Sequence, residues 1–181
     1  MGSVLVAFSS AEGATSSIAE RIAGYLRAHL SDIHAVDCMP VEAVTWPNSY
    51  RAVVLGSAVH GAAWLPAART FLSRHSDDLH SIPFYAFSVG IPAAMPKWMK
   101  RMAVRDLGEK EQLKLGEAVS SAAGHPVRHE LFNGVATQHG LGWGWGLLWA
   151  CVGAQYGDYR EWDKVDNYAS EILGKLEKME W

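Results

Sequence analysis

The chain has 181 residues, of which 49% are hydrophobic and 19% charged, and its formal net charge is −3. This length and composition are typical of one folded domain that needs no disulfides, so we expect residues 1–181 to form a single domain. Disordered and fibrous classes are excluded by the composition. The mild acidity offers no basic cluster for a phosphate backbone, so no nucleic-acid partner is expected.

The cysteines and the first residues predict where the protein works. Cys38 and Cys151 lie far apart and neither has a closely spaced Cys or His partner, which favours two reduced thiols over a metal or dithiol site. The run from Met1 to Phe8 lacks the positively charged region of a secretory signal. We therefore expect a cytoplasmic protein.

Short apolar runs alternate with helical patterns along the first half of the chain. Residues 4–8 are continuously apolar, which predicts a strand buried on both faces. Thr15 precedes apolar residues spaced three and four apart, which predicts a helix to Leu30 with a hydroxyl cap. A weak strand is predicted over residues 33–38 and a strong one over residues 52–55.

The same alternation continues to the end of the chain. We expect a helix over residues 66–75, a strand over 83–88, a helix within 109–123 and a strand over 127–132. The last helix is predicted over residues 163–177, with an inward stripe formed by Val165, Tyr168, Ala169, Ile172, Leu173 and Leu176.

Five strands separated by helices predict a doubly wound α/β fold, because parallel neighbours need crossover connections and the connections here are helical. In such sheets ligands bind beyond the carboxyl ends of the strands. Function is therefore expected in the loops after Phe8, Leu55 and Phe87.

The first of these loops has the composition of an anion site. Residues 9–17 carry five hydroxyl side chains and one glycine, and they lead directly into the first predicted helix. Backbone N–H groups at a helix start bind phosphate without a basic residue. The loop has no Lys or Arg, which excludes a P-loop, and the three-glycine dinucleotide pattern is absent. A serine-rich helix cap without a ligand is the alternative.

The second loop, residues 56–66, combines small residues with the aromatic Trp64, and the third loop is residues 88–98. Trp64 is either a core residue or the cover of a flat ring, and His60 is either a hydrogen-bonded loop residue or a catalyst. Residues 88–98 are rich in Gly and Pro. They either present backbone groups to a heterocycle or form only a rigid connection.

Four stretches together carry a resemblance to a known family: residues 8–15, 56–66, 87–90 and 157–163. With these stretches the chain resembles the flavodoxin-like FMN proteins, most closely the branch that contains menaquinone-dependent protoporphyrinogen oxidase. The resemblance implies a five-stranded parallel sheet of order 2-1-3-4-5, with helices on both faces and one FMN bound noncovalently. It implies no catalytic side chain, because the flavin carries the chemistry. His125 and His129 are four residues apart, which suits a metal only on a helix, but Pro126 and Val127 lie between them near a predicted strand start, so no metal is expected.

The resemblance also implies which residues bind the cofactor. The phosphate would be held by Ser9, Ser10, Ala11, Glu12, Gly13, Ala14 and Thr15. The isoalloxazine ring would be flanked by Ser57, Ala58, Val59, His60, Gly61 and Trp64, and by Ser88, Val89, Gly90, Ile91 and Pro92. The oxidase has an arginine at the place of His60.

An uncharged, Trp- and Gly-rich stretch at about residues 139–157 is predicted as an insertion in the domain. It is either a short apolar helix packed on the domain or a flap that docks a quinone, a porphyrin or a membrane. The second alternative places a peripheral membrane contact between Leu141 and Val152.

Two functions follow from the resemblance. The first is an FMN-dependent oxidoreductase that uses a quinone or another small redox substrate, with protoporphyrinogen as one electron donor. The second is a flavodoxin-type electron carrier that docks to redox proteins. The modest net charge favours the first, because carriers gain association rate from a strong field. A structural or regulatory domain without flavin is the third alternative.

Overall fold

A twisted sheet with five parallel strands in the order β2-β1-β3-β5-β6 organises the protein. The computed structural model describes residues 3–30, 35–60, 63–90, 105–136 and 156–179, with no side chains for 105–111. Counted among the parallel strands alone, this order is 2-1-3-4-5, so the predicted doubly wound α/β fold is confirmed. A short sixth strand, β4 (Ala63–Trp64), pairs antiparallel with β3.

The parallel strands and the helices alternate along the chain as expected. The strands are β1 (Ser3–Ser9), β2 (Ala35–Pro40), β3 (Ala52–His60), β5 (Phe84–Gly90) and β6 (Arg128–Asn133). The α-helices are α1 (Ala14–His29), α2 (Pro66–Arg74), α3 (Ser76–His80), α5 (Arg105–Ala123) and α7 (Trp162–Leu176). Two 3₁₀ turns, Val41–Ala43 and Pro47–Ser49, lie between β2 and β3.

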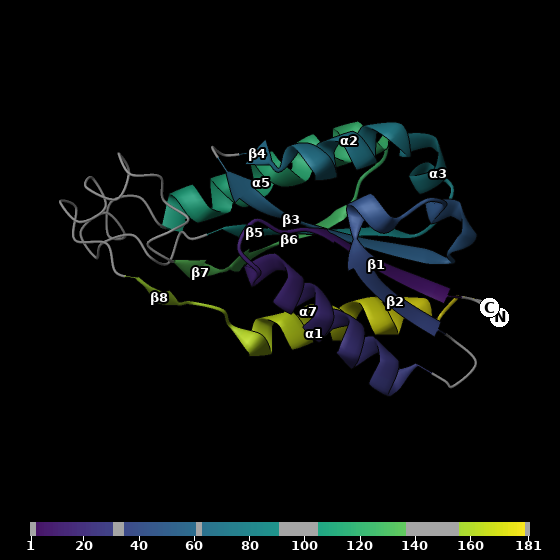
Figure 1. Cartoon of the computed structure of the whole chain (residues 1–181), viewed down its shortest axis with the longest axis horizontal. Coiled ribbons are helices and arrows are strands. Elements are labelled where there is room, and N and C mark those ends of the chain that lie inside the picture. Colours follow the sequence, from purple (N-terminus) through teal and green to yellow (C-terminus); the bar gives the residue numbers. More distant parts are fainter. Residues whose placement is uncertain (1–2, 31–34, 61–62, 91–104, 137–155, 180–181) are drawn as a thin grey trace.

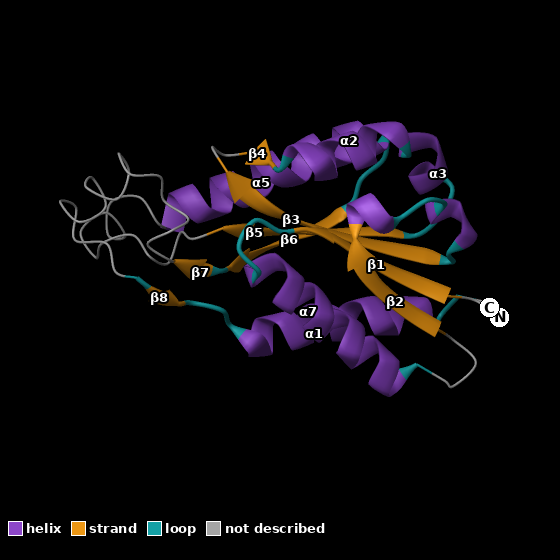
Figure 2. Cartoon of the chain, viewed as in Figure 1, coloured by secondary structure: helices purple, strands orange, loops and turns teal. Residues whose placement is uncertain are grey.

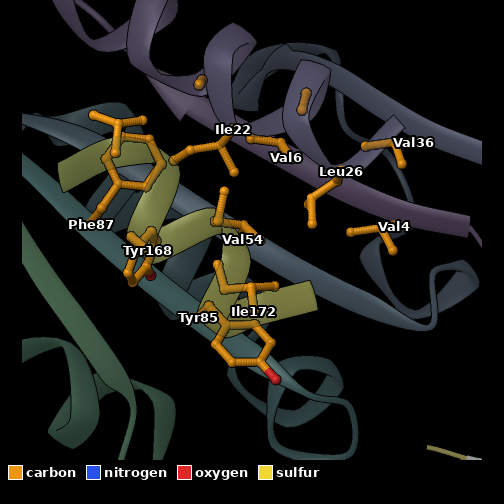
Figure 3. Packing of buried hydrophobic residues seen from close by; sticks show 14 of the residues in the cluster. Val4, Val6, Ile22, Leu26, Val36, Val54, Tyr85, Phe87, Tyr168 and Ile172 are labelled. Atoms are coloured by element: carbon orange, nitrogen blue, oxygen red, sulfur yellow. The ribbon is translucent and has the colours of Figure 1, made fainter. Parts of the chain in front are cut away.

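Both faces of the sheet are covered by helices, which explains why the strands are continuously apolar. Helices α1 and α7 lie on one face, and α2, α3 and α5 lie on the other (Figures 1 and 2). Each face has its own buried core. Figure 3 shows the core beneath α1 and α7, where Ile22 and Leu26 of α1 meet Val6 and Val54 of the sheet. The predicted inward stripe of α7 is buried at all six positions.

Some element boundaries differ from the predictions. The weak strand begins at Ala35 and continues to Pro40, and β3 continues five residues beyond Leu55 because it pairs with β4 as a hairpin. The helix that begins at Pro66 ends at Arg74, and the separate helix α3 follows it.

Gly56 of β3 makes room for an aromatic ring. Phe87 lies opposite Gly56 on β5, is fully buried, and packs against Phe132 with a centroid distance of 5.8 Å. A Cβ atom at position 56 would lie 2.0 Å from Cζ of Phe87. The absence of a side chain at position 56 is therefore what allows the Phe87 ring to lie across the sheet.

Gly56→Ala should lower the free energy of unfolding by about 2 kcal/mol or more, because the buried ring must move. The matched control is Gly24→Ala on the exposed side of α1, where a Cβ meets nothing within 4 Å. The control should raise stability by about 0.5–1 kcal/mol through helix propensity. Urea titration of both variants measures the difference, and equal effects would contradict this account of Gly56.

Candidate functional site

The loop between β1 and α1 leaves a helix N-terminus open. Gly13 is the N-cap residue and has a left-handed backbone with φ of 87°. Within the described residues, no side chain caps this terminus and its first turn holds no acidic residue. The prediction of a hydroxyl cap at Thr15 is wrong, because the N-cap is Gly13, two residues earlier, and Thr15 lies inside the helix, almost fully buried.

The hydroxyl groups of this loop are divided between two uses. Ser16 and Ser17 donate to the carbonyl oxygens of Gly13 (2.8 Å) and Ala14 (2.9 Å). The Ser10 hydroxyl accepts a hydrogen bond from the Gly13 amide at 3.1 Å, which leaves its own proton available for an acceptor. The amides of the first helical residues have no acceptor within a helix, so they point outward as donors. The donor set is uncharged and suits an anion.

The three predicted loops begin at one level of the sheet. In the register of the strands, Ser9 of β1 lies beside Ser57 of β3, and Ser57 lies beside Ser88 of β5. All three serines are buried. This serine row marks the edge where the carboxyl ends of three parallel strands meet.

The hydroxyls of Ser57 and Ser88 are used within the protein. Ser57 Oγ donates to the Ala58 carbonyl at 2.9 Å and accepts from the Leu65 amide at 3.1 Å. Ser88 Oγ accepts from Trp64 Nε1 at 2.7 Å. Trp64 is only 5% exposed and belongs to the core under α2, which is the first of the two alternatives for this residue.

His129 of β6 extends this buried chain, a role that its spacing from His125 in the sequence does not indicate. Its Nε2 lies 2.8 Å from Ser88 Oγ, and its ring lies against Gly116 of α5. Burial lowers the pKa of His129 to about 4, so the ring is neutral near pH 7. The chain from Trp64 through Ser88 to His129 ties the β3–β4 hairpin to β5 and β6.

The other predicted ring-binding residues are placed at or beyond the same edge. Ala58 and Val59 are partly buried, His60 is exposed at the end of β3, and Val89 and Gly90 are buried at the end of β5. The predictions for Gly61, Ile91 and Pro92 and for the insertion at about residues 139–157 lie outside the described residues, apart from Tyr156 and Gly157.

The C-terminal segment before α7 reaches the open end of α1. Strand β8 (Gly157–Asp158) pairs antiparallel with β7 (Val135–Ala136), which directly follows β6 (Figure 1). This pairing brings Arg160 to Ser17 of α1, with a distance of 2.6 Å between Nη1 and Oγ. Hydrogen bonds from the side chain and backbone of Arg160 lower the pKa of Asp158 to about 2. The sequence analysis used residues 157–163 for the resemblance but assigned no role to Arg160.

These features define a class of protein: a doubly wound α/β domain whose first helix starts, without a side-chain cap among the described residues, at the edge where the strands end. The chain belongs to the flavodoxin domain family, whose model matches residues 5–144. The resemblance seen in the sequence is thereby confirmed, and membership of this family indicates FMN as the cofactor.

Comparisons with individual proteins agree with this assignment. Over 98 residues the chain is 29% identical to protoporphyrinogen IX dehydrogenase [quinone] of Escherichia coli K12, and the match covers 51% of each chain. The chain thus spans about half the length of the curated relatives it matches.

Two solved structures show the same fold. Oxidised flavodoxin 2 from Bacillus cereus is similar with a TM-score of 0.57 at 19% identity, over 96% of this chain and 99% of that chain. Rubredoxin oxygen:oxidoreductase from Desulfovibrio gigas is similar with a TM-score of 0.60 at 14% identity, over 98% of this chain but 36% of that chain.

The residues present fit FMN. The uncapped start of α1 offers outward amides and the Ser10 hydroxyl to a phosphate, and the exposed N-cap Gly13 provides no Cβ that would obstruct it. The ends of β3 and β5 lie on the same edge of the sheet, where the ring of a nucleotide held at α1 can reach.

The buried His129 predicts a loss of stability in acid. In the unfolded chain the His129 ring binds a proton with a pKa of about 6.5. In the folded chain the pKa of the same ring is about 4. The contribution of neutral His129 to the free energy of unfolding is therefore fully present above pH 6.5. It is lost as the pH drops toward 4, which lowers the free energy of unfolding by up to about 3 kcal/mol.

His129→Gln should flatten the pH dependence of the free energy of unfolding between pH 6.5 and 4. The control, His60→Gln, changes an exposed histidine and should leave the slope as in the wild type. Urea titrations at several pH values measure both. A wild-type slope in the His129→Gln variant would refute this assignment.

Proposed function

We propose that this protein is an FMN-dependent oxidoreductase that passes electrons to a quinone. The observation that carries the proposal is the serine row beside the uncapped start of α1. A phosphate bound at the helix start would lie at the same edge of the sheet as the ends of β3 and β5, which can flank a ring. When bound, FMN supplies the redox chemistry. The chain supplies binding, orientation and surroundings.

The start of α1 binds the phosphate in this proposal. Ser9 ends β1, Ser10 orients Gly13, and Ala14 and Thr15 offer helix amides; Ala11 and Glu12 belong to the same loop. The amides and the helix dipole together favour a dianion. The Ser10 hydroxyl adds one further donor.

The ring lies against the ends of β3 and β5 in this proposal. Ser57 and Ser88 act as positioning residues, because their hydroxyls hold the Leu65 amide and the Trp64 indole in place. The chain from Ala58 to His60 and from Val89 to Gly90, at the ends of these two strands, then meets the ring edge. A fixed backbone is pre-organised for such contacts and needs no acid or base side chain.

The quinone is supported by the relative from Escherichia coli, whose name contains both a porphyrinogen and a quinone. We therefore propose a quinone as acceptor and protoporphyrinogen IX as one donor. The formal net charge of −3 gives only a weak field for docking to a redox protein. Within the part of the chain that the structure describes, no helix is both long and apolar enough to span a bilayer.

Anaerobic quinone titration tests this proposal. The FMN-loaded protein is reduced by light, mixed with menadione under argon, and followed through the flavin absorbance. We expect stoichiometric reoxidation at least about tenfold faster than for free reduced FMN, which is the control, because the protein binds both reactants together.

The donor is tested separately by adding protoporphyrinogen IX and excess menadione and measuring porphyrin fluorescence over many turnovers. Rapid electron transfer to cytochrome c, with quinone reduction no faster than for free FMN, would contradict the proposal and support an electron carrier.

A further inference from the structure

The segment that carries Arg160 is held tightly against the start of α1. The Gly134 amide donates to the Gly90 carbonyl at 2.7 Å, and the Gly134 carbonyl accepts from the Tyr159 amide at 3.1 Å. A Cβ at position 134 would lie 2.9 Å from Val89 and 3.6 Å from the Ala14 side chain. The end of β5, the start of α1 and the residue before Arg160 thus meet around one glycine.

Three residues orient the Arg160 side chain: Asp158, Trp162 and Ser17. Asp158 accepts hydrogen bonds from Nε at 2.8 Å and from Nη2 at 2.5 Å. The guanidinium carbon lies 4.7 Å from the centre of the Trp162 ring. The remaining nitrogen, Nη1, donates to Ser17 Oγ at 2.6 Å. The carboxylate therefore lies on one edge of the guanidinium, and the opposite, positive edge faces α1.

This orientation places a cation where the first loop has none. No Lys or Arg occurs from Ser9 to Ser17, yet FMN carries a doubly negative phosphate. Ser17 is the fourth residue of α1 and lies about one turn, roughly 5 Å along the axis, from Ala14. A guanidinium has five N–H groups, of which three are used in the bonds to Asp158 and Ser17, so donors remain for an oxyanion.

We propose that Arg160 is a binding residue for the FMN phosphate and makes the site selective for FMN over riboflavin. This inference rests on the proposed function, because it needs the phosphate at the start of α1. Asp158 and Trp162 act as positioning residues that hold the guanidinium toward the helix. A charge-assisted hydrogen bond at a partly buried arginine affects a phosphate ligand and leaves the uncharged riboflavin unaffected.

Binding of both flavins to Arg160→Gln tests the inference. The apoprotein is titrated with FMN and with riboflavin, and the dissociation constants come from flavin fluorescence and calorimetry. We expect the constant for FMN to rise about tenfold and that for riboflavin to change by less than about twofold. The FMN affinity of the variant should also depend less on salt.

Arg21→Gln is the matched control. Arg21 is a residue of α1 that lies further from the start of the helix. Like Arg160, it makes a two-bond ion pair with an aspartate, here Asp166, with both distances 2.7 Å. The same loss of one positive charge should leave both dissociation constants as in the wild type.

The outcomes separate this inference from the proposed function. Wild-type protein that binds neither flavin would refute both. Tight FMN binding that Arg160→Gln leaves unchanged, or weakens equally for riboflavin, would overturn the role of Arg160 alone.

If Arg160→Gln does not fold, a crystal structure of the wild-type protein with FMN decides the question. An Arg160 nitrogen within hydrogen-bonding distance of a phosphate oxygen supports the inference, and a guanidinium bonded only to Asp158 and Ser17 overturns it.

Discussion

The start of α1, which no side chain of the described residues caps, is the constraint on which the proposed site depends. A parallel sheet brings the carboxyl ends of β1, β3 and β5 to one edge, and the serine row shows that three of its loops begin at the same level there. Gly13 then turns the chain into α1 without a side-chain cap among the described residues. Helix amides without a cap need an acceptor, and in the proposed function the phosphate of FMN is that acceptor.

Two sets of contacts hold this edge from opposite sides. On the face covered by α2 and α5, Trp64, Ser88 and His129 form a hydrogen-bonded chain that fixes the β3–β4 hairpin. Near α1, the pairing of β7 with β8 fixes Asp158 and Arg160. The contacts of Trp64, Ser88 and His129 join neutral groups in the core, whereas Asp158 and Arg160 form an ion pair near the start of α1. Together they join elements that are far apart in the sequence at the edge where the strands end.

The sequence predicts the fold well because burial follows periodicity. The strand order implied by the family resemblance and the inward stripe of α7 both hold in the structure. The cap at Thr15 fails because a left-handed glycine starts the helix earlier than a hydroxyl pattern indicates. The sequence could not place Arg160 and His129 at this edge, because the serines that they contact there, Ser17 and Ser88, lie 143 and 41 residues away, so only the folded chain joins them.

The central claim is that the first amides of α1 hold the flavin phosphate. Backbone amide NMR spectra of the wild-type protein test it most directly, with FMN, riboflavin and inorganic phosphate added in separate titrations. The account predicts that the amides of Ala14, Thr15 and Ser16 shift most with FMN, shift in the same direction with phosphate, and barely move with riboflavin. Large FMN-induced shifts confined to other residues, with these three amides unmoved, would contradict it.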